Sequence, residues 1–332
     1  MRKIGVLTSG GDAPGMNAAI RAVVRTAIYN DLDVVGIKRG YAGLIEGEFV
    51  EMKANSVSDV IQRGGTFLLS ARCEEFRTEA GRKKAAEQMK KNNIDSLIII
   101  GGDGSLTGAN AFYKEQGIPY IGIPGTIDND LAGTDYTIGF DTAMNTIVDA
   151  INKVRDTATS HGRTFIMETM GRTTGFLTVM AGMAGGADAL LIPEKEADID
   201  EVCDKLIKRN KQGRLHNMVL VAEGYGGDFQ TNRDINESNA FAISKYISEK
   251  TGQETRVIIL GHLQRGGSPT VMDRILASRL GSRAVELLIE GETAQMVGLM
   301  NNKIVNNNVE EILANKKDIN MKLYQLSKIL SI

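Results

Sequence analysis

Cysteine is scarce in this chain of 332 residues. Cys73 and Cys203 are its only two cysteines, and they lie far apart in the sequence. Their spacing matches no metal-binding motif and gives no basis for a disulfide-stabilised scaffold. Such sparing use of cysteine is typical of a reducing compartment, so we expect a cytoplasmic protein.

Net charge is also nearly absent, because 39 basic and 41 acidic side chains sum to −2. Such a chain has no long-range field to attract nucleic acid or an anionic membrane, so we expect neither as a partner. Any anionic ligand must then be held by a local pocket. No apolar run reaches the roughly 18 residues of a membrane-spanning helix, and the first residues show no signal peptide, so we expect a soluble protein.

What the chain does contain is a regular alternation of strand-like and helix-like segments. Its length allows two domains of ordinary size. Short, almost continuous apolar runs are typical of strands buried in a parallel sheet, and they alternate with segments whose apolar residues lie three or four apart. The pattern predicts a layered α/β architecture. The predicted strands are 4–7, 34–37, 97–100, 120–123, 165–167, 189–192, 218–221 and 257–260, and the predicted helices are 17–29, 79–91, 142–160, 199–211, 240–251 and 275–289.

Two stretches depart from this alternation. The polar segment 224–238, rich in glycine, asparagine and aspartate, is expected to form a surface loop. The tail 301–332 begins with runs of asparagine and continues with lysine-rich helical spacing. We expect it to form a peripheral helical segment.

Glycine-rich turns follow two of the predicted strands. The segment Gly101-Gly102-Asp103-Gly104-Ser105 opens a helical stretch, so its backbone N–H groups and the helix dipole could receive a polyphosphate. Asp103 would then hold Mg²⁺ against the phosphate oxygens. The alternative is a plain strand-to-helix turn with Ser105 as its N-cap. Residues 9–12 (Ser-Gly-Gly-Asp) repeat the arrangement, and neither turn matches a P-loop or a dinucleotide-binding motif.

An acidic turn, Asp128-Asn129-Asp130, follows the predicted strand 120–123. Ligands of open α/β sheets bind at this end of the strands. A carboxylate placed there can take the proton of an attacking hydroxyl in phosphoryl transfer. The competing interpretation is a solvated turn rich in Asx residues, and for this turn taken alone it is the better one.

Several arginines lie beside glycines near strand ends rather than on solvated helix faces. Guanidinium groups bind phosphate through two hydrogen bonds and neutralise charge on a transferring phosphoryl group. Each one alone is more simply a surface residue, but five of them at turns favour a phosphate site. They are Arg72, Arg163, Arg172, Arg256 and Arg265, with His262 close to the last.

Four longer motifs carry a resemblance to a known family: Gly-Gly-Asp-Gly-Ser (101–105), Pro-Gly-Thr-Ile-Asp-Asn-Asp (124–130), Met-Gly-Arg (170–172) and Gly-His-Leu-Gln-Arg-Gly-Gly-Ser-Pro (261–269). The chain closely resembles bacterial ATP-dependent 6-phosphofructokinases from its first strand to about Ala294. The resemblance implies transfer of the γ-phosphoryl of Mg-ATP to the 1-hydroxyl of fructose 6-phosphate, a step of glycolysis. It also implies two Rossmann-like three-layer α/β/α domains with mainly parallel sheets and an active site in the cleft between them. Residues 1–139 with 264–314 would bind the nucleotide, and 140–263 with 315–332 the sugar phosphate.

The resemblance assigns roles to individual positions. The catalytic residues would be Asp128 as the base, Arg172 as the transition-state stabiliser, Thr126 and Asp130. ATP would be held by Gly11, Arg72, Cys73, Gly102, Asp103, Gly104 and Ser105, with Asp103 as the Mg²⁺ ligand. Fructose 6-phosphate would contact Thr126, Asp128, Met170, Gly171, Arg172, Glu223, His262 and Arg265, and a neighbouring subunit would supply Arg163 and Arg256. A homotetramer with shared active sites is therefore implied.

Regulation is where the chain departs from the family pattern. The pocket for ADP or phosphoenolpyruvate is represented by Arg21, Arg25, Arg155, Asp188 and Arg214. Ala54 and Gln212 stand where typical members have basic residues, and each lost charged hydrogen bond costs about 1.5–3 kcal/mol. We therefore expect weak allosteric control. The stretch between Glu223 and Arg256 is also longer than usual, so the polar loop within it is expected to be an insertion.

Two rival functions stay open beside the main one. Pyrophosphate-dependent relatives carry Asp in place of Gly104 and Lys in place of Gly125, whereas two glycines leave room for ATP. A non-catalytic subunit that senses nucleotides would be favoured by the loss of Asp128 or Arg172, and both are present.

Overall fold

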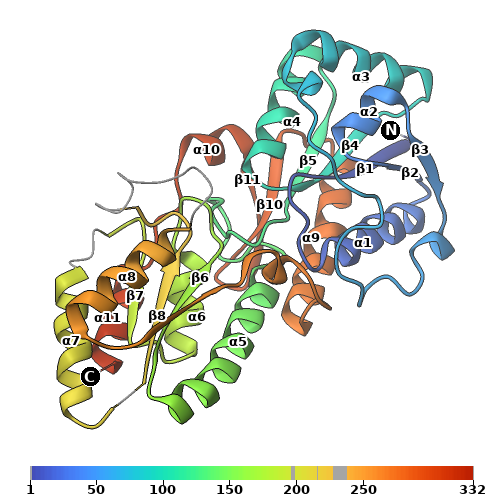
Figure 1. Cartoon of the computed structure of the whole chain (residues 1–332). Coiled ribbons are helices and arrows are strands. Elements are labelled where there is room, and N and C mark those ends of the chain that lie inside the picture. Colours follow the sequence, from blue (N-terminus) through green and yellow to red (C-terminus); the bar gives the residue numbers. More distant parts are fainter. Residues whose placement is uncertain (1, 196–198, 215, 227–237, 332) are drawn as a thin grey trace. The chain divides into compact units, whose positions relative to one another are not determined.

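The computed structural model describes residues 2–195, 199–214, 216–226 and 238–331 of the chain (Figure 1). These residues form two compact units, each with a sheet of its own. Unit 1 comprises Met1–Thr142 and Arg265–Lys317, and unit 2 comprises Ala143–Gln264 and Asp318–Ile332. The surface loop expected at 224–238 falls mostly on residues 227–237, which lie outside the described residues.

Unit 1 is built around a seven-stranded sheet in the order β11-β10-β5-β4-β1-β2-β3. The five inner strands run parallel, whereas β3 and β11 pair antiparallel at the two edges. Strand β4 is buried along its whole length, as its unbroken run of isoleucines predicts. The strands are β1 (Lys3–Ser9), β2 (Asp33–Ile37), β3 (Phe49–Met52), β4 (Ser96–Gly101), β5 (Tyr120–Pro124), β10 (Gln295–Met300) and β11 (Lys303–Asn308).

Helices cover both faces of this sheet. On one face α1 (Met16–Tyr29) packs against α9 (Val271–Ile289). On the other face four helices share an apolar core with alternate strand residues such as Leu97 and Ile99. Unit 1 is therefore a three-layer α/β/α sandwich. The four helices are α2 (Tyr41–Glu46), α3 (Glu79–Lys91), α4 (Asp103–Gln116) and α10 (Val309–Ala314), and short 3₁₀ helices lie at Ala54–Val57 and Glu75–Arg77.

Unit 2 has a smaller, all-parallel sheet in the order β7-β8-β6-β9. Alternate residues of β8 face opposite layers: Val219 and Val221 join the core under α7 (Ile199–Lys211) and α8 (Asn239–Thr251), while Leu220 faces Gly182 of α6 (Phe176–Ala184). Helix α11 (Met321–Leu330) packs on α6 and β7. The strands are β6 (Thr164–Thr169), β7 (Ala189–Leu191), β8 (Asn217–Ala222) and β9 (Thr255–Ile259).

The chain passes between the units three times, and the third passage follows Lys317. Helix α5 (Phe140–His161) begins in unit 1 and continues in unit 2, and the 3₁₀ helix Gly261–Arg265 leads back. None of the helices in the described part of the chain combines the length and apolar character that crossing a bilayer requires.

The predicted α/β architecture with mainly parallel sheets is confirmed, and each predicted strand and helix is present with small shifts at its ends. The prediction for the tail is wrong in part. Residues Lys303–Asn308 form the edge strand β11, which pairs with β10 from Gln295↔Asn308 to Met300↔Lys303. Three consecutive asparagines have low strand propensity, so the conformation is decided by pairing with β10. Strands β3 and β10 and helices α2 and α6 were not predicted.

Candidate active site

The turns after three neighbouring strands of unit 1 touch one another at the carboxyl edge of the sheet. After β5, the N–H of Gly125 donates to the carbonyl of Gly101 at 3.0 Å. A Cβ added to Gly101 would lie 2.6 Å from the carbonyl oxygen of Ser9, at the end of β1. A Cβ added to Gly102 would lie 3.5 Å from Cβ of Thr126. The close approach at Gly101 requires glycine, whereas the distance at Gly102 is an ordinary contact. Together these contacts place the predicted nucleotide and catalytic turns side by side.

The turn at 101–105 is the start of helix α4. The helix begins at Asp103 with Gly102 as its N-cap, so the alternative interpretation with Ser105 as N-cap is wrong. Ser105 is buried, and its carbonyl accepts a 2.5 Å hydrogen bond from Tyr41. Asp103 and Gly104 are exposed, and a Cβ added to Gly104 would meet nothing within 4 Å among the described residues. The N-terminus of α4 is therefore open and lined by glycine, a geometry that could receive an anion.

The turn after β1 is covered by an arginine from a distant part of the chain. Nη1 of Arg265 donates to the carbonyl of Asp12 at 3.1 Å. A Cβ added to Gly11 would lie 2.5 Å from the same nitrogen, so any side chain at Gly11 would displace the guanidinium group. On the opposite side, the Ser70 hydroxyl donates to the carbonyl of Gly10 at 2.6 Å. Arg265 was predicted as a sugar-phosphate residue, and within unit 1 it lies on a turn predicted to bind nucleotide.

The acidic turn after β5 is buried. Asp128 is 1% exposed and Asn129 is 4% exposed, so the interpretation as a solvated turn is wrong for both. The N–H of Asp128 donates to Oγ1 of Thr126 at 3.2 Å, and the hydroxyl of Thr137 donates to the carbonyl of Thr126 at 2.6 Å. Asp130 is half-buried. These bonds fix the direction in which the Asp128 carboxylate leaves the turn.

Asn129 holds the turn in a left-handed conformation, with φ of 54°. Its Oδ1 accepts hydrogen bonds from the Thr137 N–H at 3.0 Å and from Nζ of Lys317 at 2.9 Å, and Lys317 also donates to the carbonyl of Asp135 at 2.9 Å. Burial lowers the pKa of Lys317 to about 8, although Asp135 and Asp130 oppose the shift. Sequence reasoning missed Lys317, because it lies in the tail that was predicted to be peripheral.

Unit 2 carries the second predicted half of the site, the turn after β6. Gly171 has φ of 138° and Arg172 has φ of 53°. The carboxylate of Glu223 accepts hydrogen bonds from both backbone N–H groups, at 3.2 and 2.5 Å. Oε1 of the buried Gln264 accepts from the N–H of Met170 at 3.1 Å. Glu223 therefore shapes the backbone that presents Arg172, and Gln264, which lies within the 261–269 motif, was not singled out from the sequence.

Arg163 and Arg256 lie together at the edge of the unit 2 sheet where strands β6 and β9 begin. Nε of Arg163 lies 2.8 Å from Oε2 of Glu254, and Nη2 of Arg256 pairs with Oε1 of the same carboxylate. The hydrogen bond from Arg163 holds the pKa of Glu254 below its ordinary value, and the charge of Arg256 adds to the effect. His262 lies exposed on the 3₁₀ helix of unit 2.

Comparisons with known proteins show the family of the chain. The family model for phosphofructokinase matches residues 3–288. The chain belongs to the phosphofructokinase family. It is 67% identical over 331 residues to a Halothermothrix orenii protein named ATP-dependent 6-phosphofructokinase, covering 100% of both chains.

Solved phosphofructokinase structures have the same fold. One from Saccharomyces cerevisiae is 38% identical with a TM-score of 0.88, and the match covers 95% of this chain and 45% of the yeast chain. A pyrophosphate-dependent phosphofructokinase from Marinobacter aquaeolei has a TM-score of 0.84 at 21% identity, over 97% of this chain and 86% of its own. The second likeness is one of fold alone.

Gly104 and Gly125, which bear on whether a phosphofructokinase uses ATP or pyrophosphate as its phosphoryl donor, lie in different surroundings. Gly104 faces open space, as described above. A Cβ added to Gly125 would lie 2.9 Å from Cγ2 of Ile100 and 3.2 Å from Cε of Met16, inside the packed layer beneath the turn. Both were expected to leave room for ATP. In this structure Gly104 leaves open room, whereas Gly125 satisfies a packing requirement.

The remaining predicted nucleotide residues of this phosphofructokinase lie on the segment before α3. Arg72 is exposed, and Cys73 is half-buried against the apolar core of unit 1. The loop that precedes them is attached to β1 by Thr8, whose hydroxyl donates to the carbonyl of Leu69 at 2.9 Å. Both cysteines, Cys73 and Cys203, are free thiols.

The predicted effector residues are divided between the units. Arg21 and Arg25 lie on α1 in unit 1, where the 3₁₀ helix that begins at Ala54 packs against α1. In unit 2, Arg155 donates to the carbonyls of Gly185 and Gly186, and Arg214 is exposed. The Asp188 carboxylate pairs with Arg209 at 2.5 Å and accepts from the N–H of Met218 at 2.7 Å. These internal bonds occupy both oxygens of Asp188.

Proposed function

We propose that Asp128 and Arg172 carry the ATP-dependent 6-phosphofructokinase reaction of this chain. The activity is the one named for a relative that is 67% identical along the full length of both chains. The observation that supports the catalytic assignment is the position of Asp128, which is 1% exposed at the carboxyl end of β5 and directly follows residues that contact the α4 turn. The reaction moves the γ-phosphoryl of ATP to the 1-hydroxyl of fructose 6-phosphate.

Asp128 is the proposed general base. A bond forms between the sugar O1 and the γ-phosphorus, the bond from that phosphorus to the β,γ-bridging oxygen breaks, and the hydroxyl proton passes to the Asp128 carboxylate. Thr126 and Asn129 orient the carboxylate through the bonds of the turn. Asp130 takes a supporting role. Arg172 would neutralise charge on the transferring group, since its backbone is held by Glu223 in a conformation that only a fixed turn sustains.

The nucleotide would bind in unit 1 at the glycine turns, with Gly11, Arg72, Cys73, Gly102, Gly104 and Ser105 around it. The N-terminus of α4 fits Mg-ATP, because the exposed Asp103 stands between two glycines at an open helix start. Among the described residues no cluster of three side chains could hold a metal alone, so Mg²⁺ would be shared between Asp103 and the phosphates. When bound, Mg²⁺ neutralises phosphate charge.

Fructose 6-phosphate would bind to unit 2 through the Met170-Gly171-Arg172 turn, Glu223 and His262, with Arg265 added from unit 1. We propose that Arg163 and Arg256 serve the 6-phosphate of a neighbouring subunit in a homotetramer. Their shared contact with Glu254 supports this role, because it keeps two guanidinium groups together at one point. The cleft between the two units and the division of ligands between them stay predictions.

Regulation and location complete the proposal. ADP or phosphoenolpyruvate would act weakly at Arg21, Arg25, Arg155, Asp188 and Arg214. A cytoplasmic location agrees with two free cysteine thiols. Of the rival functions, the pyrophosphate-dependent one has support only from a fold likeness at 21% identity. The nucleotide-sensing subunit is disfavoured because Asp128 and Arg172 are both retained.

A donor assay tests the function. The purified full chain is supplied with fructose 6-phosphate and either Mg-ATP or Mg-pyrophosphate, and fructose 1,6-bisphosphate is measured. We expect turnover with ATP, at the 1–100 s⁻¹ usual for kinases, and none above background with pyrophosphate. Efficient turnover with pyrophosphate alone would contradict the proposed donor, and no turnover with either would favour the nucleotide-sensing subunit.

A further inference from the structure

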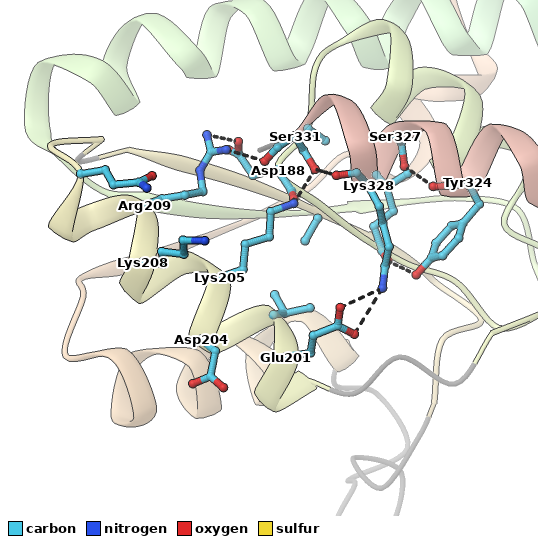
Figure 2. Close-up of a pocket in the computed structure, with 15 residues that line it drawn as sticks. Asp188, Glu201, Asp204, Lys205, Lys208, Arg209, Tyr324, Ser327, Lys328 and Ser331 are labelled. Atoms are coloured by element: carbon cyan, nitrogen blue, oxygen red, sulfur yellow. Dashed lines mark hydrogen bonds and ion pairs between the residues drawn. The ribbon is translucent and has the colours of Figure 1, made fainter.

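A pocket in unit 2 lies between α7, β7 and α11 and is used by none of the catalytic roles above (Figure 2). Its volume is about 420 Å³, which is within the range of small-molecule sites. One wall is apolar and consists of Ala187, Ala189, Leu190, Val202 and the ring of Tyr324. This wall can bury the body of a small ligand, at a gain of about 25 cal/mol per Å² of apolar surface.

Polar contacts frame the pocket at the C-terminal ends of α7 and α11. Arg209 pairs with Asp188 at 2.5 Å and donates to the carbonyl of Ser331 at 2.6 Å. Lys205 donates to the carbonyl of Asp188 at 2.8 Å and also bonds to Oγ of Ser331. These contacts attach α11 to α7 and hold two cationic groups beside the apolar wall.

A second ion pair closes the opposite side, where Lys328 of α11 lies 3.3 Å from Glu201 of α7. Lys328 also lies over the ring of Tyr324, with Nζ 5.9 Å from the ring centre. The walls are thus fixed by bonds between the two helices, and the space between them is bounded on two sides by charge.

Positive charge is in excess around Lys205. Burial lowers the pKa of Lys205, and the charge of Arg209 lowers it further, whereas the carboxylates of Asp188 and Glu201 oppose the shift. Nε of Arg209 is buried without a hydrogen-bond partner in the described part of the chain. Lys208 also lines the pocket, and Figure 2 shows the Asp204 carboxylate directed away from Lys205 and Arg209. Arg209 is already paired with Asp188, so an acidic group placed between Lys205 and Lys208 would serve as a counterion for these two lysines.

We propose that this pocket binds a small organic anion, with its apolar body on the wall of Leu190 and Tyr324 and its acidic group between Lys205 and Lys208. Both halves are required. A free inorganic anion would leave the apolar wall unfilled, and a neutral hydrocarbon would leave the excess charge uncompensated. The site shares Asp188 with the expected effector set, and Gln212 also lines it, but Arg155 and Arg214 do not. Binding here does not depend on the catalytic assignments.

A matched pair of fluorescent probes tests the proposal on the full chain. The anion 8-anilino-1-naphthalenesulfonate has an aromatic body and one acidic group, and N-phenyl-1-naphthylamine is the same body without that group. We expect the anion to bind with one site per chain. The Lys205→Met, Lys208→Gln double variant is expected to weaken it at least tenfold, while binding of the neutral probe changes less than twofold.

Two further variants separate the pocket from the rest of the surface. Lys211→Gln removes an exposed charge from the same helix outside the pocket, so binding of the anion should be unchanged. Val202→Trp fills the apolar wall and should abolish binding of both probes, with circular dichroism showing that the fold is kept. The proposal is overturned if the double variant binds the anion as tightly as Lys211→Gln does, or if Val202→Trp is folded and still binds it.

Discussion

The ammonium group of Lys317 lies 2.9 Å from Oδ1 of Asn129, the residue between the two carboxylates of the acidic turn. A second hydrogen bond ties the same group to the carbonyl of Asp135, which lies beyond the turn. Lys317 therefore links Asn129, the residue directly after Asp128, to the backbone at Asp135. At neutral pH the group is charged, because burial lowers its pKa only to about 8. Its role is to position the turn.

Replacing Lys317 should impair catalysis more than substrate binding. In Lys317→Met the turn keeps its bond to Thr137 but loses the bonds to Asn129 and Asp135. Because small misplacements of a catalytic group are costly, we expect kcat to fall about 10- to 100-fold with little change in the KM for fructose 6-phosphate. Lys316→Met, at the exposed neighbouring position, serves as the control and should behave as the unaltered enzyme. Equal kinetics for the two variants would refute the positioning role.

Removal of the proposed base has a distinct signature. Asp128→Ala should lower kcat by about 10² to 10⁴, the usual contribution of a general base, while nucleotide affinity changes little. Asp130→Ala should lower kcat by less, because this half-buried side chain has the supporting role. Steady-state kinetics together with calorimetric titration of ADP separate the two effects. If kcat of Asp128→Ala stays within a few-fold of the starting value, Asp128 is not the base.

Because the carboxylate of Asp273 is buried, we expect the free energy of unfolding to depend on pH. It accepts hydrogen bonds from the backbone N–H groups of Gly139 and Thr142, both at 2.8 Å, at the start of α5. Burial nevertheless raises its pKa from 3.8 to about 6. Between these values the folded state binds the proton more tightly, so this group makes stability fall as pH rises from about 4 to 6 and leaves it constant above. The full effect is about 3 kcal/mol at 1.36 kcal/mol per pKa unit.

Asp273→Asn removes this titration. Urea unfolding midpoints of both proteins, measured from pH 4 to 7, should show a difference that changes with pH up to about 6 and is constant beyond it. The amide also loses an acceptor for Thr142, which adds about 1–3 kcal/mol of destabilisation at every pH. A difference that is the same at pH 4 and pH 7 would show that the carboxylate does not titrate in this range.

Allosteric control should be weak. Ala54 and Gln212 offer no charge to an anionic effector, and the oxygens of Asp188 are already bound by Arg209 and Met218. We expect saturation by fructose 6-phosphate to change little with ADP or phosphoenolpyruvate. The double variant Ala54→Arg, Gln212→Lys should gain sensitivity to both. Strongly sigmoidal saturation relieved by micromolar ADP in the unaltered protein would contradict this prediction.

The sequence predicted the framework of the fold because its signals are local. The isoleucine run before Gly101 is typical of a strand buried on both faces, and the glycines after it mark where the chain must approach its neighbours. Strand β11 escaped prediction because its conformation depends on pairing with β10, which is not encoded in the three asparagines at 306–308. Tertiary contact outweighs propensity there.

The candidate site was predictable in its turns but not in the groups that support them. Motifs indicated Asp128 and Arg172, yet the burial of Asp128 and the anchoring of Arg172 by Glu223 became visible only in the structure. Lys317 lies 188 positions from Asn129 along the chain, and no local pattern connects them. The contact between Arg265 and Gly11 spans a still longer separation, and no local pattern predicts it either.

Glu254 is the shared counterion of the two arginines proposed to bind the 6-phosphate. Its single carboxylate keeps Arg163 and Arg256 together, so a phosphate that took both guanidinium groups would act as a replacement counterion. Such an exchange favours a dianion over a monoanion, because only the dianion brings more charge than the carboxylate it displaces. The pair would then discriminate by ligand ionisation state, and a sugar ending in a carboxylate would have little advantage over Glu254 itself.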